Sequence, residues 1–200
     1  MISSNKLALA CACLFLSATA FSQSPNSVIE EVIEILNTSL AERKDELASD
    51  EDALYALIDE ILLPRFDRTS AAKAVLSKHW KTATPEQQND FVDAFYGAMV
   101  KRYADGLLKF DQSKVELKPF RGDESKRMVI VKTTVTLADG TKVPVDYRLV
   151  KHDSTWLILD VIIEGISYIR NYRSEMDAEI RETNLDAVIA RLQNEVNGEA

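Results

Sequence analysis

Residues 128–149 read MVIVKTTVTLADGTKVPVDYRL, and this stretch decides the fold. Apolar side chains recur at every second position in both halves, which is typical of strands with one buried face. Asp139-Gly140, between the halves, is a tight-turn signal of β-hairpins. The stretch therefore predicts two long antiparallel strands joined by a short turn.

Further strands are predicted on each side of this hairpin. Residues 156–163 are apolar apart from Asp160, and they follow a turn at His152-Asp153-Ser154. A strand that is apolar at almost every position is normally covered on both faces. Residues 115–117 form a shorter candidate before the hairpin. Consecutive strands with short connections predict an antiparallel meander.

Helices are predicted before and after the sheet, because apolar residues recur there at three- and four-residue steps. Thr84-Pro85 and Asn184 are helix-start signals, and Gln87 can complete a capping box with Thr84. A polar hinge is expected over 44–52. The fold class is therefore α+β. The expected helices cover residues 27–40, 54–62, 70–81, 84–110, 166–180 and 184–196.

The N-terminus is typical of a secretory signal peptide over residues 1–20. Lys6 precedes a short apolar run, and Ala18 and Ala20 suit cleavage after residue 20, with Ser22 as an alternative site. Cys11 and Cys13 are interpreted as apolar filler, although a lipoprotein acceptor cysteine is an alternative. Residues 21–200 are then expected to form one domain without cysteine, in a compartment that permits disulfides.

Charge excludes some partners. The formal net charge is −8, and residues of both signs are interspersed. An acidic surface argues against nucleic acid and against electrostatic binding to anionic membranes. We interpret the charge as a source of solubility, and we expect a monomer.

Catalytic and metal-binding patterns are absent from the sequence, so no catalytic residue, metal or cofactor is predicted. Histidines occur only at 79 and 152, without the spacing of a metal site or a catalytic triad. Asp160 is unusual because burying an unpaired carboxylate is costly. An ion pair with Arg170 or Arg173 is the favoured interpretation, and a catalytic role or a contact to a ligand head group or partner protein are alternatives.

Four motifs of this chain occur together in a characteristic order. One consists of Trp156, Asp160, Glu164-Gly165, Ser167 and Asn171-Tyr172-Arg173. The others are Pro64-Arg-Phe66-Asp67, the region from Trp80 to Tyr103, and the closing helix from Leu185 to Leu192. Together they resemble the MlaC family of periplasmic phospholipid carriers, also described as toluene-tolerance auxiliary components, and the resemblance extends from about residue 27 to residue 192.

The resemblance implies helices packed on a curved antiparallel sheet, with an apolar cavity between them that holds acyl chains. It also implies two partners in the Mla pathway, an inner-membrane ABC transporter complex with an MCE-domain protein and an outer-membrane lipoprotein associated with a porin. The cargo would be a phospholipid carried through the periplasm between the two membranes. From facing apolar stripes we expect the lipid-binding residues to be Phe95, Met99, Tyr103, Leu107, Val145, Tyr147, Trp156, Ile158, Ile162, Ile166 and Ile169.

Two rival functions remain open from the sequence. One is an enzyme on a similar cone-shaped α+β fold that uses Asp160 or a histidine. The other is an envelope adaptor that fills its own cavity and carries nothing. Apolar stripes occur in a packed core and in a lipid cavity alike, so periodicity does not separate the three.

Overall fold

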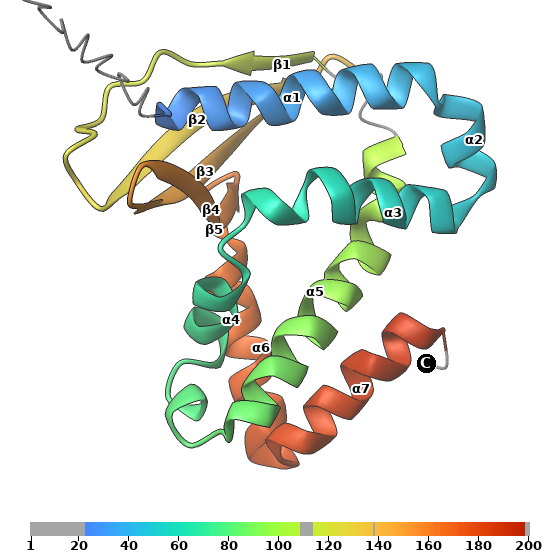
Figure 1. Ribbon diagram of the computed structural model, residues 1–200, viewed down its shortest axis with the longest axis vertical. Coiled ribbons are helices and arrows are strands. Elements are labelled where there is room, and N and C mark those ends of the chain that lie inside the picture. The colour runs from blue at the N-terminus through green and yellow to red at the C-terminus, as the bar shows by residue number, and fades with distance from the viewer. Residues whose placement is uncertain (1–22, 109–113, 138, 199–200) are drawn as a thin grey trace, which may run out of the picture.

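The structure is a computed structural model that describes residues 23–108, 114–137 and 139–198. The signal peptide expected over residues 1–20 and its two cysteines lie outside this range. Two regions are visible in Figure 1. One holds the sheet with the N-terminal helices, and the other is a group of four helices that extends away from one end of the sheet.

The sheet is an antiparallel meander, as the sequence predicts, but in the described residues it has a fifth short strand at Ile166–Ser167, where the sequence predicts the start of a helix. Its spatial order equals its order along the chain. At the turn after β2, Gly140 has a φ of 86°, a left-handed conformation that glycine adopts without strain. The strands are β1 (Lys114–Leu117), β2 (Met128–Thr136), β3 (Lys142–His152), β4 (Thr155–Ile163) and β5 (Ile166–Ser167).

A β-bulge interrupts the pairing of β3 with β4. Arg148 pairs with Asp160 and Leu149 pairs with Ile158, so Leu159 is the extra residue. An extra residue reverses which side chains face a given side of the sheet. Trp156 and Ile158 therefore share a face with Val161 and Ile163 rather than with Ile162.

Three helices accompany the sheet in the first region: α1 (Pro25–Glu42), α2 (Lys44–Ser49) and α3 (Glu51–Ile61). Helix α1 lies along one face of the sheet (Figure 1). The polar hinge expected over 44–52 is wrong, because residues 44–49 form α2. Asp45 and Glu46 in its first turn suit the positive end of the helix dipole, and Leu47 is buried.

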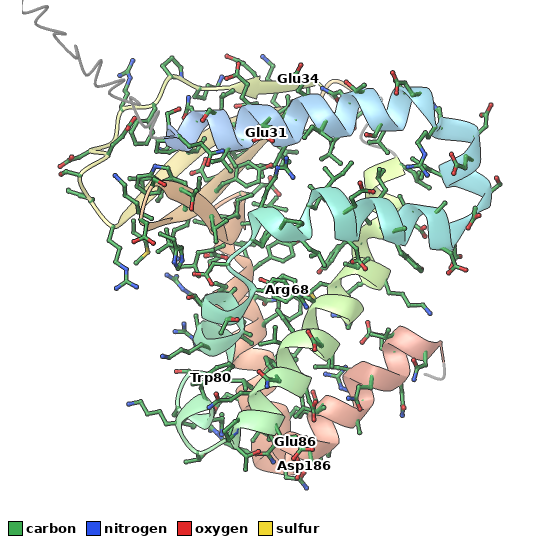
Figure 2. All side chains as sticks on the ribbon, in the orientation of Figure 1. Glu31, Glu34, Arg68, Trp80, Glu86 and Asp186 are labelled. Atoms are coloured by element: carbon green, nitrogen blue, oxygen red, sulfur yellow. The ribbon has the colours of Figure 1, made fainter. Side chains whose placement is uncertain are left out.

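Four α-helices form the second region: α4 (Arg68–Leu76), α5 (Pro85–Leu108), α6 (Tyr168–Glu182) and α7 (Leu185–Asn197). Short 3-10 turns, η1 (Leu63–Arg65) and η2 (His79–Lys81), flank α4. The capping box is confirmed: the Thr84 amide donates to Gln87 Oε1 at 3.0 Å, and the Gln87 amide donates to Thr84 Oγ1 at 3.1 Å. At the lower end of Figure 2, where Glu86 and Asp186 are labelled, Gln87 Nε2 of α5 donates to Asp186 Oδ1 of α7 at 2.6 Å.

The buried apolar side chains of the described residues form three clusters, each joining a different set of helices and strands. The buried side chains of α4, α5, α6 and α7 pack together, with Phe91 and Phe95 stacked at 5.5 Å between ring centroids. A second cluster joins α1, α2, α3 and α5. A third joins α1 to the sheet and contains Val28, Ile29 and Trp156. Residues from all three clusters border one cavity, because the helices and the sheet are not in contact there.

Candidate functional site: an apolar cavity

A cavity of about 810 Å³ lies where the helices and the sheet diverge. Helices α1, α3, α4, α5 and α6 and the turn η1 contribute to one side of its wall, and strands β2, β3 and β4 contribute to the other. The volume falls within the roughly 300–1,000 Å³ that is usual for ligand pockets. The cavity reaches the surface near Tyr103 and Leu137, each of which is 42% exposed.

Seven of the eleven residues predicted from the sequence line this cavity. Helix α5 places three of them on one side, and the strands place three opposite. They are Phe95, Met99, Tyr103, Val145, Tyr147, Ile158 and Ile169. The side chain of Leu107 lies outside the part of the chain that the structure describes. Contact of these residues with a lipid stays a prediction.

Three predicted residues lie elsewhere. Trp156 is 1% exposed and packs against α1 in the core, because its position on β4 is beside the start of that helix. The bulge at Leu159 turns Ile162 to the opposite face of the sheet, where it pairs with Asp146. Ile166 is 63% exposed in the short strand β5, just before α6 begins.

Sequence reasoning missed the contributions of α1 and α3. Their apolar stripes were visible, but nothing in the sequence said which helix covers which part of the sheet. The bulge also turns two odd-numbered residues of β4, Val161 and Ile163, toward the cavity. The missed lining residues include Val32, Ile33, Leu36, Ile58, Leu62, Val161 and Ile163.

Asp160 is the one ionised residue among the described residues of the lining, and its carboxylate is already fully engaged. Arg148 Nη1 donates to Oδ2 at 3.1 Å, and Ser167 Oγ donates to the same oxygen at 2.6 Å. The backbone N–H of Ile169 donates to Oδ1 at 3.1 Å. The expected ion pair therefore exists, but its partner is Arg148 rather than Arg170 or Arg173. Pairing across adjacent strands brings the two together.

Five tyrosines in the described part of the chain line the cavity: Tyr96, Tyr103, Tyr147, Tyr168 and Tyr172. Tyr103 and Tyr172 share a hydrogen bond between their hydroxyls at 2.7 Å, and the rings of Tyr103 and Tyr168 meet edge to face at 5.7 Å. Burial and the hydrogen bond to Tyr172 raise the pKa of Tyr103 to about 12. Burial raises the pKa of Tyr147 to about 12 as well. The phenols of Tyr103 and Tyr147 therefore stay neutral at ordinary pH.

Neither histidine belongs to the cavity wall. His79 Nε2 lies 2.8 Å from Asp177 Oδ1, and His152 Nε2 lies 2.7 Å from Asp67 Oδ2. His152 is thus held by a residue 85 positions away rather than simply solvated in its turn. The described residues contain no cluster of His, Cys, Asp and Glu that suits a metal ion. No helix among them is long and apolar enough to cross a membrane.

Comparison with known proteins bears on this site. The family model described as MlaC protein matches residues 27–194. The toluene tolerance protein ttg2D of Pseudomonas putida is 29% identical over 181 residues, covering 89% of this chain and 84% of that protein. The intermembrane phospholipid transport system binding protein MlaC of Haemophilus influenzae is 18% identical over 173 residues, covering 85% and 81%.

A solved structure has the same fold. It is the phospholipid-binding protein from Ralstonia solanacearum, determined in complex with a phospholipid. The TM-score is 0.81, with 22% sequence identity, and the match covers 88% of this chain and 99% of that one. At this level of identity the likeness establishes the fold.

Proposed function

Because the chain belongs to the MlaC family, we propose that it carries phospholipid, with the acyl chains held in the cavity between helices and sheet. The observation that carries the proposal is the cavity of about 810 Å³ with a wall of apolar and neutral side chains. The carboxylate of Asp160, its one ionised group, is already occupied by three donors. A site of this kind can bury apolar acyl chains but provides few polar groups to bind them.

Burial alone is sufficient for a carrier. Transferring one CH₂ group from water to an apolar environment gains about 0.8 kcal/mol, so a chain of roughly 16 carbons gains on the order of 12 kcal/mol. A lipid therefore crosses an aqueous compartment far more easily inside the protein than alone. Because a bilayer offers a similar environment, a cavity with few polar anchors permits both loading and release.

The chemical class of the cargo is supported by the relatives. The Haemophilus protein is named as the binding protein of an intermembrane phospholipid transport system, and the Ralstonia protein was solved with a phospholipid bound. In this chain the cavity reaches the surface, so a lipid has a route in and out. A phospholipid combines apolar chains with a polar head, which suits an apolar cavity that reaches the surface.

The place of action follows from the N-terminus and the family. Residues 1–20 have the pattern of a signal peptide, so the chain is expected to be exported to the periplasm. There it would shuttle lipid between an inner-membrane MCE-domain ABC transporter complex and an outer-membrane lipoprotein with a porin.

No enzymatic role is proposed. Both histidines and Asp160 have structural partners, and none of the three is free to act as a general base at the cavity. An adaptor that carries nothing is disfavoured by the size of the cavity, because a pure scaffold would gain from packing it.

A two-compartment transfer experiment tests carriage. Donor vesicles with an isotope-labelled phospholipid and unlabelled acceptor vesicles are separated by a filter that passes the protein but retains vesicles. Carriage predicts labelled phospholipid in the acceptor compartment in proportion to protein concentration. Transfer no faster than in buffer alone would refute it.

A further inference from the structure

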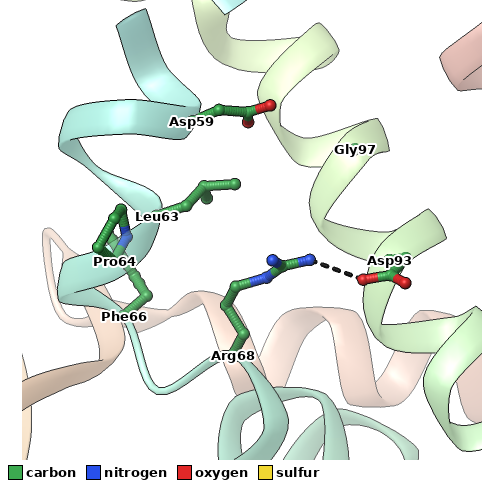
Figure 3. Close-up of a pocket in the computed structure, with 7 residues that line it drawn as sticks. All are labelled: Asp59, Leu63, Pro64, Phe66, Arg68, Asp93 and Gly97. Carbon is green, nitrogen blue, oxygen red and sulfur yellow. Dashed lines mark hydrogen bonds and ion pairs between the residues drawn. The ribbon is translucent and has the colours of Figure 1, made fainter. Parts of the chain in front are cut away.

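A second pocket of about 490 Å³ lies where the end of α3, the turn η1, the start of α4 and the middle of α5 meet. Figure 3 shows its residues around a common space between α3 and α5. Unlike the large cavity, it contains several charges. Its residues are Asp59, Leu63, Pro64, Phe66, Arg68, Asp93 and Gly97.

The two spaces share part of their walls. Leu63 and Phe66 line both the pocket and the large cavity. In Figure 3 the Leu63 side chain projects from the end of α3 toward α5, between Asp59 and Arg68. A molecule with an apolar part in the cavity and a polar part in the pocket would thus pass these two apolar side chains. Pro64, which follows Leu63, interrupts the helical hydrogen bonding at this point.

Arg68 supplies the positive charge of the pocket. Its Nη2 donates to Asp93 Oδ1 at 2.9 Å, and its guanidinium lies over the Tyr96 ring at 5.2 Å from the centroid. Its Nε is buried without a hydrogen-bond partner among the described residues. Figure 2 shows Arg68 at the junction of the two regions of the molecule. A guanidinium with a donor that has no partner is suited to an anion such as phosphate.

Among the residues that the structure describes, the second pocket has two carboxylate side chains and one cationic side chain. Asp59 on α3 and Asp93 on α5 face the pocket, against Arg68 alone. Asp93 already balances Arg68, which leaves the carboxylate of Asp59 to complement a positive group. The pocket thus presents a cation and an anion at separate points, with a net negative charge.

We propose that this pocket receives the head group of the lipid whose acyl chains fill the cavity, and that it favours a zwitterionic head group with a phosphodiester and a primary ammonium. The inference rests on the proposed carrier function and adds head-group selectivity to it. The phosphate accepts hydrogen bonds from Arg68, and the ammonium lies near Asp59. A head group with a phosphodiester alone would add negative charge to a pocket that already has an excess, so it binds less well.

Competitive loading tests the selectivity. The exported protein is incubated with vesicles of equal amounts of phosphatidylethanolamine and phosphatidylglycerol with identical acyl chains, and its bound lipids are extracted and quantified. We expect phosphatidylethanolamine to be enriched by about two- to fivefold, the size expected from one partly exposed charge. The Asp59→Asn variant should bring the ratio close to that of the vesicles.

Glu60→Gln is the matched control, because it removes one negative charge from the next position of α3 without altering the pocket lining. Its lipid ratio should equal that of the wild type. Bound lipid in the ratio of the vesicles, or an unchanged ratio in Asp59→Asn, overturns the head-group assignment and leaves the carrier function intact. Failure of the wild type to take up either lipid overturns the carrier function itself.

A paramagnetic label tests the location. Since both cysteines of the chain precede residue 20, Glu60→Cys and Lys142→Cys each give a single labelling site in the exported protein. A nitroxide at position 60 should broaden the ³¹P signal of bound phosphatidylethanolamine more than one at position 142, at the β2–β3 end of the cavity. The reverse order would overturn the assignment.

Discussion

The guanidinium of Arg148 donates a hydrogen bond to the carboxylate of Asp160 at 3.1 Å, across the neighbouring strands β3 and β4. The Asp160 side chain is 0% exposed. Its other two donors, the hydroxyl of Ser167 and the backbone N–H of Ile169, lie at the start of α6. One buried carboxylate therefore fixes where the sheet ends and the second helical region begins.

Asp160→Ala tests this structural role. The variant leaves three donors without their acceptor, so we expect a loss of about 2–4 kcal/mol in the free energy of unfolding, measured by urea denaturation. Asp90→Ala, an exposed change on α5, is the control and should lose little. A stability equal to the wild type, together with complete loss of bound lipid, would instead mean that Asp160 contacts the cargo.

Val145→Arg tests the position of the acyl chains. Val145 is 8% exposed and lines the cavity from β3. A guanidinium there would be buried without a partner when lipid is bound, so bound lipid should fall by on the order of tenfold or more. The control is Pro144→Arg, because Pro144 is exposed on the same strand. Equal lipid content in the two variants would contradict the placement.

The bulge at Leu159 makes a sharper prediction about β4. Val161→Asn puts an amide into the cavity wall, whereas Ile162→Asn puts it on the opposite face of the sheet. Because an unpartnered buried amide costs about 1–3 kcal/mol, only the first variant should lose bound lipid, on the order of tenfold. Extraction and quantification of lipid from both variants decides the point. A greater loss in Ile162→Asn would show that period-two alternation continues through the strand.

The Asp67–His152 pair predicts a pH dependence. Burial raises the pKa of the Asp67 carboxyl, but the hydrogen bonds from Ser70 and His152 outweigh burial and leave the pKa below its ordinary value of 3.8. The unfolded chain therefore binds this proton more readily than the folded one. The stabilisation is complete above pH 3.8 and is lost as the pH falls through the folded pKa.

Asp67→Asn isolates that charge, because asparagine still caps α4. At pH 6 we expect the variant to be less stable by about 1–2 kcal/mol, with the difference shrinking toward zero at about pH 2.5. Urea denaturation at both pH values measures it. Asp90→Asn should match the wild type at both, and a pH-independent difference for Asp67→Asn would contradict the charge pair.

Much of the fold could be predicted from local signals in the sequence. The turn at Asp139-Gly140, the capping box at Thr84 and the cap at Asn184 all appear in the structure. Each of these turn and cap signals depends on residues that are neighbours in the sequence, so a single sequence is enough to detect it. Helix α2 was missed because six residues with a single buried apolar position, Leu47, give no periodicity to detect.

The cavity was harder to predict, because its wall depends on how distant elements pack. The stripe of α5 and the inward face of β3 were identified correctly as parts of one lining. Ile162 was misplaced because a β-bulge leaves no signal in alternation alone, and Trp156 because its burial depends on where α1 starts. Likewise, no local pattern indicates that Asp59 and Arg68 border one pocket.

Native mass spectrometry of the protein purified gently from a bacterial periplasm, combined with solvent extraction, tests carriage most directly. We predict a chain that begins near residue 21, with one phospholipid mass bound to most molecules and the same lipid in the extract. A chain of the same mass without lipid, which takes up none from added vesicles, would contradict the carrier function.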